Sequence, residues 1–405
     1  MAGVNQPKTP AIGVQPRTRI ESVDILRGAA VLLMALGHTR LFFSRDLLDF
    51  YPPDLSETYG TLFLTQWVAR FCSPIFFFLA GTAAFLSARR KSKGELARFL
   101  AVRGVWLIFL ELTLVKLAWL FEYDYHAFGG SVLWAVGWSM IVLAGLVRLS
   151  SWAITASGIV IIATHNLFDA IRAEELGPWR WLWVILHEPG SSLALSSSIE
   201  FSVMFPLIPW IGVVAAGYGF GALLQTEPVE RRKHVFRVGA GLTLAFVALR
   251  FSNLYGDPSS WAIEKSALFT VFSFINCQTS PPSLLLLLMT LGPSLIVLAL
   301  LDRPPGRLAP LFLVFGRVPL FFYLVHLTMI HAFAVTWSYL KHGGIDWLIG
   351  LTPDPAAAEF YPEGYGLSLP GIYAVWLLVV AVMYPLCRWF AAVKQRRRYA
   401  WLSYF

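Results

Sequence analysis

The chain has 405 residues, of which 57% are hydrophobic and only 14% are charged. Soluble globular chains carry roughly 25% charged residues, so this composition excludes an ordinary soluble domain. The formal net charge of +8 does not indicate nucleic-acid binding. Its basic residues form short clusters between long apolar segments, which is the pattern of a membrane protein.

The apolar segments are about 20 residues long, which as helices match the ~30 Å hydrocarbon core of a bilayer. They lack the alternation at every second residue that is typical of a membrane barrel. We therefore predict an all-α polytopic bundle of about ten transmembrane helices. The expected spans are Ile25–Phe43, Leu62–Ser87, Phe99–Leu120, Val132–Val147, Trp152–Ile171, Phe201–Leu224, Gly239–Leu254, Ser283–Leu301, Leu311–Leu340 and Gly371–Val393.

The positions of the basic residues predict the orientation. They cluster in the connections that follow even-numbered spans and in the C-terminal tail, so both termini are expected in the cytoplasm. We expect a cytoplasmic tail over residues 1–21, a single membrane domain over 22–393 and a basic cytoplasmic tail over 394–405. The tail before the first span has no apolar signal-peptide core, so that span is expected to be an uncleaved anchor. The apolar segment Ser266–Phe274 is too short to span and is expected in an outer loop or as a re-entrant piece.

The three cysteines, Cys72, Cys277 and Cys387, are odd in number and far apart. The sequence has no CxxC motif and no Cys/His cluster, so we expect neither a disulfide framework nor a metal site. The cysteines are expected to be small apolar packing residues.

The first span combines Asp24, Arg27 and His38 in one helix. Arg27 and His38 are eleven residues apart, which puts them within about 20° of each other on one face and roughly 16 Å apart along the axis. Arginine at a cytoplasmic entrance suits a phosphate-bearing ligand. Imidazole suits proton transfer near neutral pH. The alternative is structural, with Arg27 as an anchor at the membrane surface and His38 paired with a neighbouring helix.

Other polar residues within or near the spans are expensive in lipid and therefore need a partner or a function. Each of these side chains could line a polar cavity or form a structural pair with a neighbouring group, and the sequence leaves both alternatives open. His165 and Asp169 are spaced to share a helix face, and helix-end capping is a further option for them. The possible cavity-lining residues are Glu111, His165, Asn166, Arg250, Asn253, Arg317 and His326.

Several segments resemble the bacterial membrane family of heparan-alpha-glucosaminide N-acetyltransferase catalytic-domain proteins. The likeness extends from the first expected span to the last. It is carried by Ser22–His38, Phe71–Thr82, Leu133–Met140, Pro281–Pro293, Phe315–His326 and Tyr384–Phe390. The wider group is similar to acyltransferase family three, whose first helix carries an Arg and a His at this separation.

The resemblance implies an enzyme that takes an acyl group from cytoplasmic acetyl-CoA or another acyl-CoA and passes it to an extracytoplasmic acceptor, commonly a saccharide or glycan. It implies that His38 is the catalytic histidine and Arg27 its paired arginine. From their place in the first span, we expect Arg27 to attract the phosphates of coenzyme A and Asp24 to orient or charge-balance Arg27. The animal lysosomal enzyme has its catalytic histidine after the first helix, where this chain has none between Thr39 and Arg70. That role and the heparan substrate are therefore not carried over.

We expect an acyl-CoA-dependent acyltransferase in the bacterial cytoplasmic membrane, with the bilayer, acyl-CoA and a glycan or small-molecule acceptor as partners and no nucleic acid. His38 would act as general base or accept the acyl group itself. The competing class is a transporter or flippase without covalent chemistry, which intramembrane Arg, Glu and His also suit. Transporters often show inverted repeats, and no such symmetry is evident here.

Overall fold

The computed structural model describes residues 20–45, 55, 58–89, 91–188, 192–304, 306–350 and 359–397. The expected N-terminal tail up to residue 19 and the end of the basic tail from residue 398 lie outside these described residues. The α-helices are α1 (Glu21–Phe43), α3 (Gly60–Ala69), α4 (Cys72–Ala88), α5 (Lys93–Leu110), α6 (Lys116–Leu120), α7 (Val132–Leu146), α8 (Ser151–Thr164), α9 (Arg180–Leu186), α10 (Leu207–Phe220), α11 (Pro228–Ser252), α12 (Ala267–Ile275), α13 (Leu284–Leu301), α14 (Ala309–Gly316), α15 (Pro319–His342) and α16 (Leu369–Arg396).

Short elements complete the chain. A π-helical turn, η1 (Glu111–Val115), joins α5 to α6, and 3-10 turns include η2 (His165–Phe168) and η3 (Ala173–Trp179). Strands β1 (Ala127–Gly130), β2 (Ser192–Ser196) and β3 (Ile199–Val203) form one small sheet in the order β1-β3-β2. β3 is parallel to β1, with Phe128 opposite Phe201, and antiparallel to β2.

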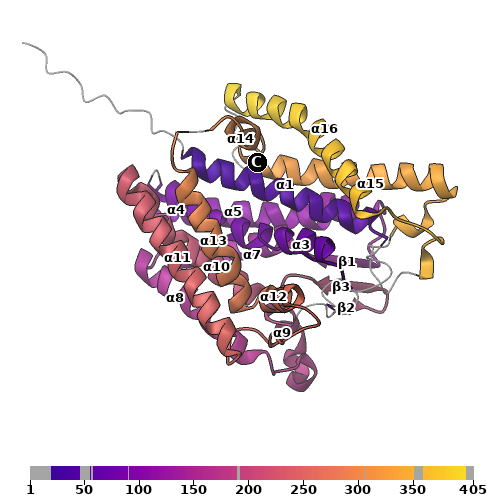
Figure 1. Cartoon of the computed structure of the whole chain (residues 1–405). Coiled ribbons are helices and arrows are strands. Elements are labelled where there is room, and N and C mark those ends of the chain that lie inside the picture. The colour runs from indigo at the N-terminus through magenta and orange to yellow at the C-terminus, as the bar shows by residue number, and fades with distance from the viewer. Residues whose placement is uncertain are drawn as a thin grey trace, which may run out of the picture.

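Helix α1 lies in the interior of the bundle. It packs against α14, α15 and α16 on one side and against α4 and α13 on the other (Figure 1). Its buried residues are spread over all its faces, which is expected of a helix surrounded by other helices. Side chains on α1 are therefore held in fixed positions by neighbours from both halves of the chain.

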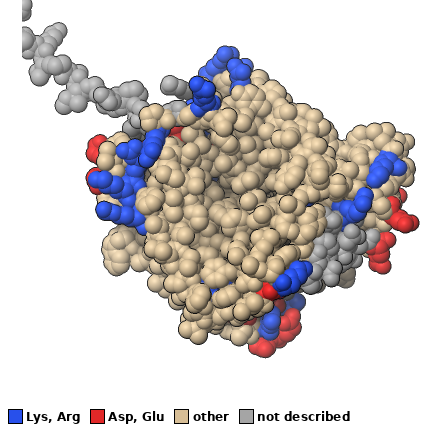
Figure 2. Space-filling view, viewed as in Figure 1, with Lys and Arg blue, Asp and Glu red and all other residues tan. Residues whose placement is uncertain are grey.

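Eight helices are long and apolar enough to cross a membrane in the described part of the chain, so the protein is a multi-pass membrane protein. Two further expected spans are also helical. One is α5 with η1 and α6, and the other is α7, which is apolar but only 15 residues long. The total of ten spans and the cytoplasmic position of both termini stay predictions. Figure 2 shows a broad face almost without charge. Lys and Arg gather at the edge where α1 and α11 begin, and further Lys and Arg lie with Asp and Glu along the opposite edge.

The structure corrects some of the expected boundaries. The sixth span was expected to begin at Phe201, but residues 199–203 pair in the sheet and the helix begins at Leu207, after Pro206. The ninth expected span is divided into α14 and α15 at Arg317–Val318, because Pro319 has no N–H to continue the first helix. The segment near Ser266–Phe274 forms the nine-residue helix α12, and its position in an outer loop or as a re-entrant piece stays a prediction.

Two glycines bring α1 and α14 into backbone contact. A Cβ added at Gly316 would lie 1.8 Å from the carbonyl oxygen of Asp24, and one at Gly28 would lie 2.0 Å from the carbonyl oxygen of Phe312. No other residue fits at these two positions, because the obstructing atoms belong to backbone. This glycine seam fixes α14, and the start of α15 beyond it, against the first two turns of α1.

Candidate functional site

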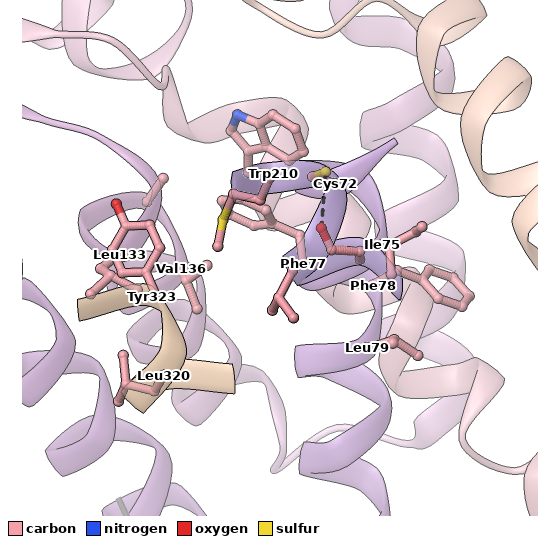
Figure 3. Close-up of a cluster of buried hydrophobic side chains, with 14 of the residues drawn as sticks. Cys72, Ile75, Phe77, Phe78, Leu79, Leu133, Val136, Trp210, Leu320 and Tyr323 are labelled. Carbon is pink, nitrogen blue, oxygen red and sulfur yellow. Dashed lines mark hydrogen bonds between the residues drawn. The ribbon is translucent and has the colours of Figure 1, made fainter. Parts of the chain in front are cut away.

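A cavity of about 330 Å³ lies among α1, α4, α5, α7 and α15. Most of its wall is apolar. Figure 3 shows Leu133, Val136, Leu320 and Tyr323 on one side of this region and Leu79 on the other. The wall residues are Met34, Phe76, Leu79, Ala80, Ala83, Ala84, Ser87, Phe99, Leu100, Leu107, Val132, Leu133, Val136, Met140, Pro319, Leu320 and Tyr323.

Four basic side chains also line this cavity, namely Arg27, Arg103, Arg317 and Lys394. None of its described lining residues is acidic. The four basic residues come from α1, α5, the α14–α15 junction and the last turn of α16, so segments far apart in sequence build one positive region. Such a region attracts phosphate groups, and the three guanidinium groups suit bidentate phosphate contacts.

Arg27 is positioned by two partners. Its Nη1 donates to Asp24 Oδ1 at 3.0 Å and to the carbonyl oxygen of Gly316 at 3.4 Å. The Asp24 side chain is 4% exposed, whereas that of Arg27 is 18% exposed, so the pair is inside the protein but reaches the cavity. Arg317 lies 3.8 Å from Glu21. The expected Asp24–Arg27 relationship is present in the structure.

His38 and His326 form a stacked pair on α1 and α15. His38 Nδ1 lies 2.9 Å from His326 Nε2, and the ring centroids are 5.1 Å apart. His326 Nδ1 lies 2.7 Å from the carbonyl oxygen of Phe322, which can only accept a hydrogen bond. With both rings neutral, His326 therefore carries its proton on Nδ1 and accepts at Nε2. His38 then donates from Nδ1, which leaves the lone pair on His38 Nε2.

Tyr323 connects this histidine pair with the cavity. It lines the cavity, and its ring contacts His38 edge-on with centroids 6.2 Å apart. Trp119 contacts His38 in the same edge-on manner at 5.1 Å. His38 is only partly buried, but among the described residues it is not one of those that line the cavity. The structure therefore brings Arg27 to the cavity directly and His38 to it through Tyr323.

Trp119 and Ser131 lie beside Tyr323, and Ser131 Oγ donates a hydrogen bond to Glu111 Oε1. The surroundings of Tyr323 therefore include a polar side chain that is held by Glu111.

Glu111 is a structural residue of the site. It is 3% exposed, and it accepts from the backbone N–H of Leu133 at 2.9 Å and of Ser131 at 3.3 Å. These N–H groups belong to the N-terminus of α7, so the carboxylate caps that helix. Glu111 begins the π-helical turn η1, which interrupts the α-helical hydrogen bonding beside the site.

Two of the candidate residues lie away from this cavity. Arg250 is 2% exposed and donates to four backbone carbonyls, of Ser259, Ser273, Phe274 and Asn276, with Asp257 at 3.7 Å. Asn253 ends α11 in the left-handed conformation and pairs with the backbone of Trp261. Both fasten the loop that follows α11, so the structure favours structural pairing for them. His165 and Asn166 lie in a third place, at the end of α8.

One comparison with known proteins decides the family. The model of the family described as "Heparan-alpha-glucosaminide N-acetyltransferase, catalytic" matches residues 19–250, which is more than half of the chain. The chain belongs to this family. The comparison with curated proteins finds no match. The matched region contains Arg27, His38 and Glu111, and α15 with Tyr323 and His326 lies beyond it. The family is one of transmembrane acetyltransferases, which agrees with the resemblance inferred from the sequence.

Sequence reasoning missed several site residues of this acetyltransferase-family protein. Tyr323 and Trp119 are aromatic residues in apolar spans, where packing is the ordinary interpretation, so nothing local distinguished them. Ser131 immediately precedes a span and gave no signal. Arg103 lies near the start of the third expected span and Lys394 in the expected basic tail, where positive charge at the membrane surface is ordinary. Only the tertiary packing of α5 and α16 shows that both reach the same cavity as Arg27.

Proposed function

We propose that this protein transfers an acyl group from acyl-CoA, bound in the cavity, to a saccharide acceptor on the opposite side of the bacterial cytoplasmic membrane. The observation that carries the proposal is a single cavity with four basic residues at its lining and with Tyr323, a neighbour of His38, also on its wall. The end of the cavity that holds the basic residues is also lined by Ser87, near the end of α4, and by Lys394, in the last turn of α16. Basic residues follow both helices in the sequence, so the positive-inside rule supports a cytoplasmic position for this end.

The chemistry of coenzyme A matches the two parts of this cavity. Its phosphates suit Arg27, Arg103, Arg317 and Lys394, and its long, largely uncharged arm suits the apolar wall. A phosphate end held at the level of Arg27 directs the thioester toward Tyr323. The distance along α1 from Arg27 to His38 is roughly 16 Å, which an extended arm has to cover. The donor then reaches the histidine pair from the cytoplasmic side.

His38 Nε2 is the proposed general base. It removes a proton from the acceptor amine or hydroxyl while that nucleophile adds to the thioester carbonyl carbon. The tetrahedral intermediate collapses, the carbon–sulfur bond breaks, and the proton on His38 passes to the departing thiolate. The products are the acylated acceptor and free coenzyme A. While His38 carries the extra proton, its Nδ1–H donates to His326 Nε2, and His326 in turn donates to the carbonyl of Phe322.

The test is acyl-CoA-dependent acylation by purified protein in vesicles, measured for wild type and His38→Ala. We expect a loss of at least about 100-fold in kcat, the usual contribution of a positioned general base. Thr328→Ala is the matched control, because Thr328 is exposed on the same helix as His326 and bonds only to its own helix. Undiminished turnover in folded His38→Ala protein would refute the assignment. If rapid quenching traps a labelled acyl group on His38, the residue accepts the acyl group as an acyl-imidazole and does not act as a general base.

A second measurement separates this proposal from transport without covalent chemistry. Coenzyme A is expected to raise the thermal unfolding temperature of the detergent-solubilised protein, because it binds only the folded cavity. Sugars and lipid headgroups of matched charge serve as comparison ligands. Stabilisation by those solutes and none by coenzyme A would favour the transporter.

A further inference from the structure

A second cluster of polar side chains lies at the far end of α8, away from the cavity. It consists of His165 at the start of η2, Asp169 directly after η2, and His187 directly after α9. One ligand atom from each lies within 4.8 Å of the other two. None of these residues lines the cavity among α1, α4, α5, α7 and α15. The cluster therefore has no part in the proposed acyl transfer.

Three of the four histidine nitrogens of this cluster have no hydrogen-bond partner among the described residues. His165 is 1% exposed, and neither of its ring nitrogens has a hydrogen-bond partner in the described part of the chain. His187 is 3% exposed and uses only Nε2, which lies 3.0 Å from Asp169 Oδ1. A buried polar atom without a partner is costly, because it has lost its hydrogen bonds to water. A ligand held by one nitrogen of each ring gives His165 a partner that the described residues do not supply.

The carboxylate between the histidines is held in place by a further residue. Asn166 Nδ2 donates to Asp169 Oδ2 at 2.8 Å, while Asn166 Oδ1 accepts from the backbone N–H of Leu284 at 2.9 Å. Asp169 Oδ1 therefore remains directed toward His187. A hydrogen bond of this kind to the second oxygen is a common support of a carboxylate that ligates a metal. Trp183 covers His187, with ring centroids 5.0 Å apart.

We propose that His165, Asp169 and His187 bind a divalent transition-metal ion, Zn²⁺ being the best match, with one coordination position left open. Two imidazoles and one carboxylate are ordinary zinc ligands, and imidazole suits Zn²⁺ better than Mg²⁺ or Ca²⁺. In a tetrahedral site with bonds of ~2.0 Å, neighbouring ligand atoms lie about 3.3 Å apart. The 3.0 Å between Asp169 Oδ1 and His187 Nε2 is close to that edge. The proposal revises the expectation of no metal made from the sequence.

The ion would join segments that are distant in the chain. His165 and Asp169 follow α8, and His187 ends α9 beyond the η3 turn. Through Asn166 the same site reaches the N-terminus of α13. Zinc bound at this place would fasten the loop between α8 and α9, with a water molecule in the fourth coordination position. The spacing of His165 and Asp169 was visible in the sequence, but His187 was not, because it is brought there only by the return of the chain through α9.

The experiment measures the metal content of full-length protein purified in detergent, by mass spectrometry of the elements. We expect about one zinc per chain in the wild type, and at least a tenfold loss in His165→Ala and His187→Ala. His126→Ala is the control, because His126 and Asp124 form a similar but exposed pair 3.1 Å apart, and it should retain the zinc. Wild-type protein with no more zinc than His165→Ala, after preparation in zinc-containing buffer, would overturn the proposal.

A second measurement does not depend on the folding of the variants. Wild-type protein is stripped with a chelator and titrated with Zn²⁺, Co²⁺ or Mg²⁺ while its unfolding temperature is recorded. Saturable stabilisation by Zn²⁺ and Co²⁺ but not by Mg²⁺ is expected, together with the visible absorption of tetrahedral Co²⁺. Equal or absent responses to the three ions would refute the site. Loss of zinc with unchanged acyl-CoA binding, or the reverse, separates this inference from the proposed acyl transfer.

Discussion

Arg27 on α1 and Tyr323 on α15 line the same cavity, and Tyr323 is also in ring contact with His38. A guanidinium group and an imidazole on one helix are thus connected by a third side chain from another helix. Tyr323 also lies beside Ser131, whose hydroxyl donates a hydrogen bond to Glu111. Tyr323→Phe is expected to lower kcat about three- to tenfold, which corresponds to the loss of one net hydrogen bond. An unchanged kcat would remove Tyr323 from the reaction.

The four basic residues of the cavity are expected to act on coenzyme binding. Arg27→Gln, Arg103→Gln, Arg317→Gln and Lys394→Gln should each raise the KM for acyl-CoA about tenfold, because one charge-assisted contact is lost. The variants should change kcat little. Lys233→Gln is the control, since Lys233 is exposed and pairs with Glu230 outside the cavity. An equal rise in KM for Lys233→Gln and for the four cavity variants would indicate only long-range electrostatic attraction of acyl-CoA.

His326 is expected to act as a positioning residue for His38. His326→Ala should lower kcat/KM about 10- to 100-fold, because His38 loses the acceptor that fixes its tautomer. His326→Gln should restore much of the activity, since its amide oxygen can accept from His38 Nδ1. The comparison of the two variants separates hydrogen bonding from packing. Similar activities of His326→Gln and His326→Ala would contradict the tautomer assigned here.

Glu111 is expected to matter mainly for stability. Glu111→Gln places an NH₂ group where one oxygen accepts hydrogen bonds from Ser131 or Leu133. We expect a loss of about 1–3 kcal/mol in the free energy of unfolding, the cost of buried donors without acceptors. Thermal unfolding in detergent measures this loss of stability. Glu95→Gln is the comparison, because Glu95 also caps a helix but lies at the exposed start of α5. A stability equal to wild type would argue against the capping role.

The glycine seam makes a further prediction about folding. Gly316→Ala should lower the yield of folded protein or its unfolding temperature strongly, because its Cβ would overlap the backbone of Asp24. Gly241→Ala is the matched control on α11, where an added Cβ meets nothing within 4 Å. That control should be neutral or slightly stabilising, since Ala favours a helix over Gly by about 1 kcal/mol. Similar behaviour of both variants would show that α1 and α14 do not need their close approach.

The sequence predicted the helical class and most of the spans, because an apolar segment of bilayer length can pair its backbone N–H and C=O groups in lipid by forming a helix. It also selected Asp24, Arg27, His38 and His326, since charged or imidazole side chains stand out in an apolar segment. It did not predict which of them meet. Arg250 carried the same signal as Arg27, yet it binds loop carbonyls, whereas Arg27 lines the cavity. Such differences depend on crossing angles between helices, and those are set by packing over the whole bundle.

The glycine seam bears on the separation of Arg27 and His38 along α1. Because the first turns of α1 meet the backbone of α14 directly, the two helices are in close contact at the level of Asp24 and Gly28. The height difference between the guanidinium of Arg27 and the imidazole of His38 is then constant from one turnover to the next. In the proposed reaction the flexible acyl donor, and not a movement of the helix, therefore bridges the distance between these two residues.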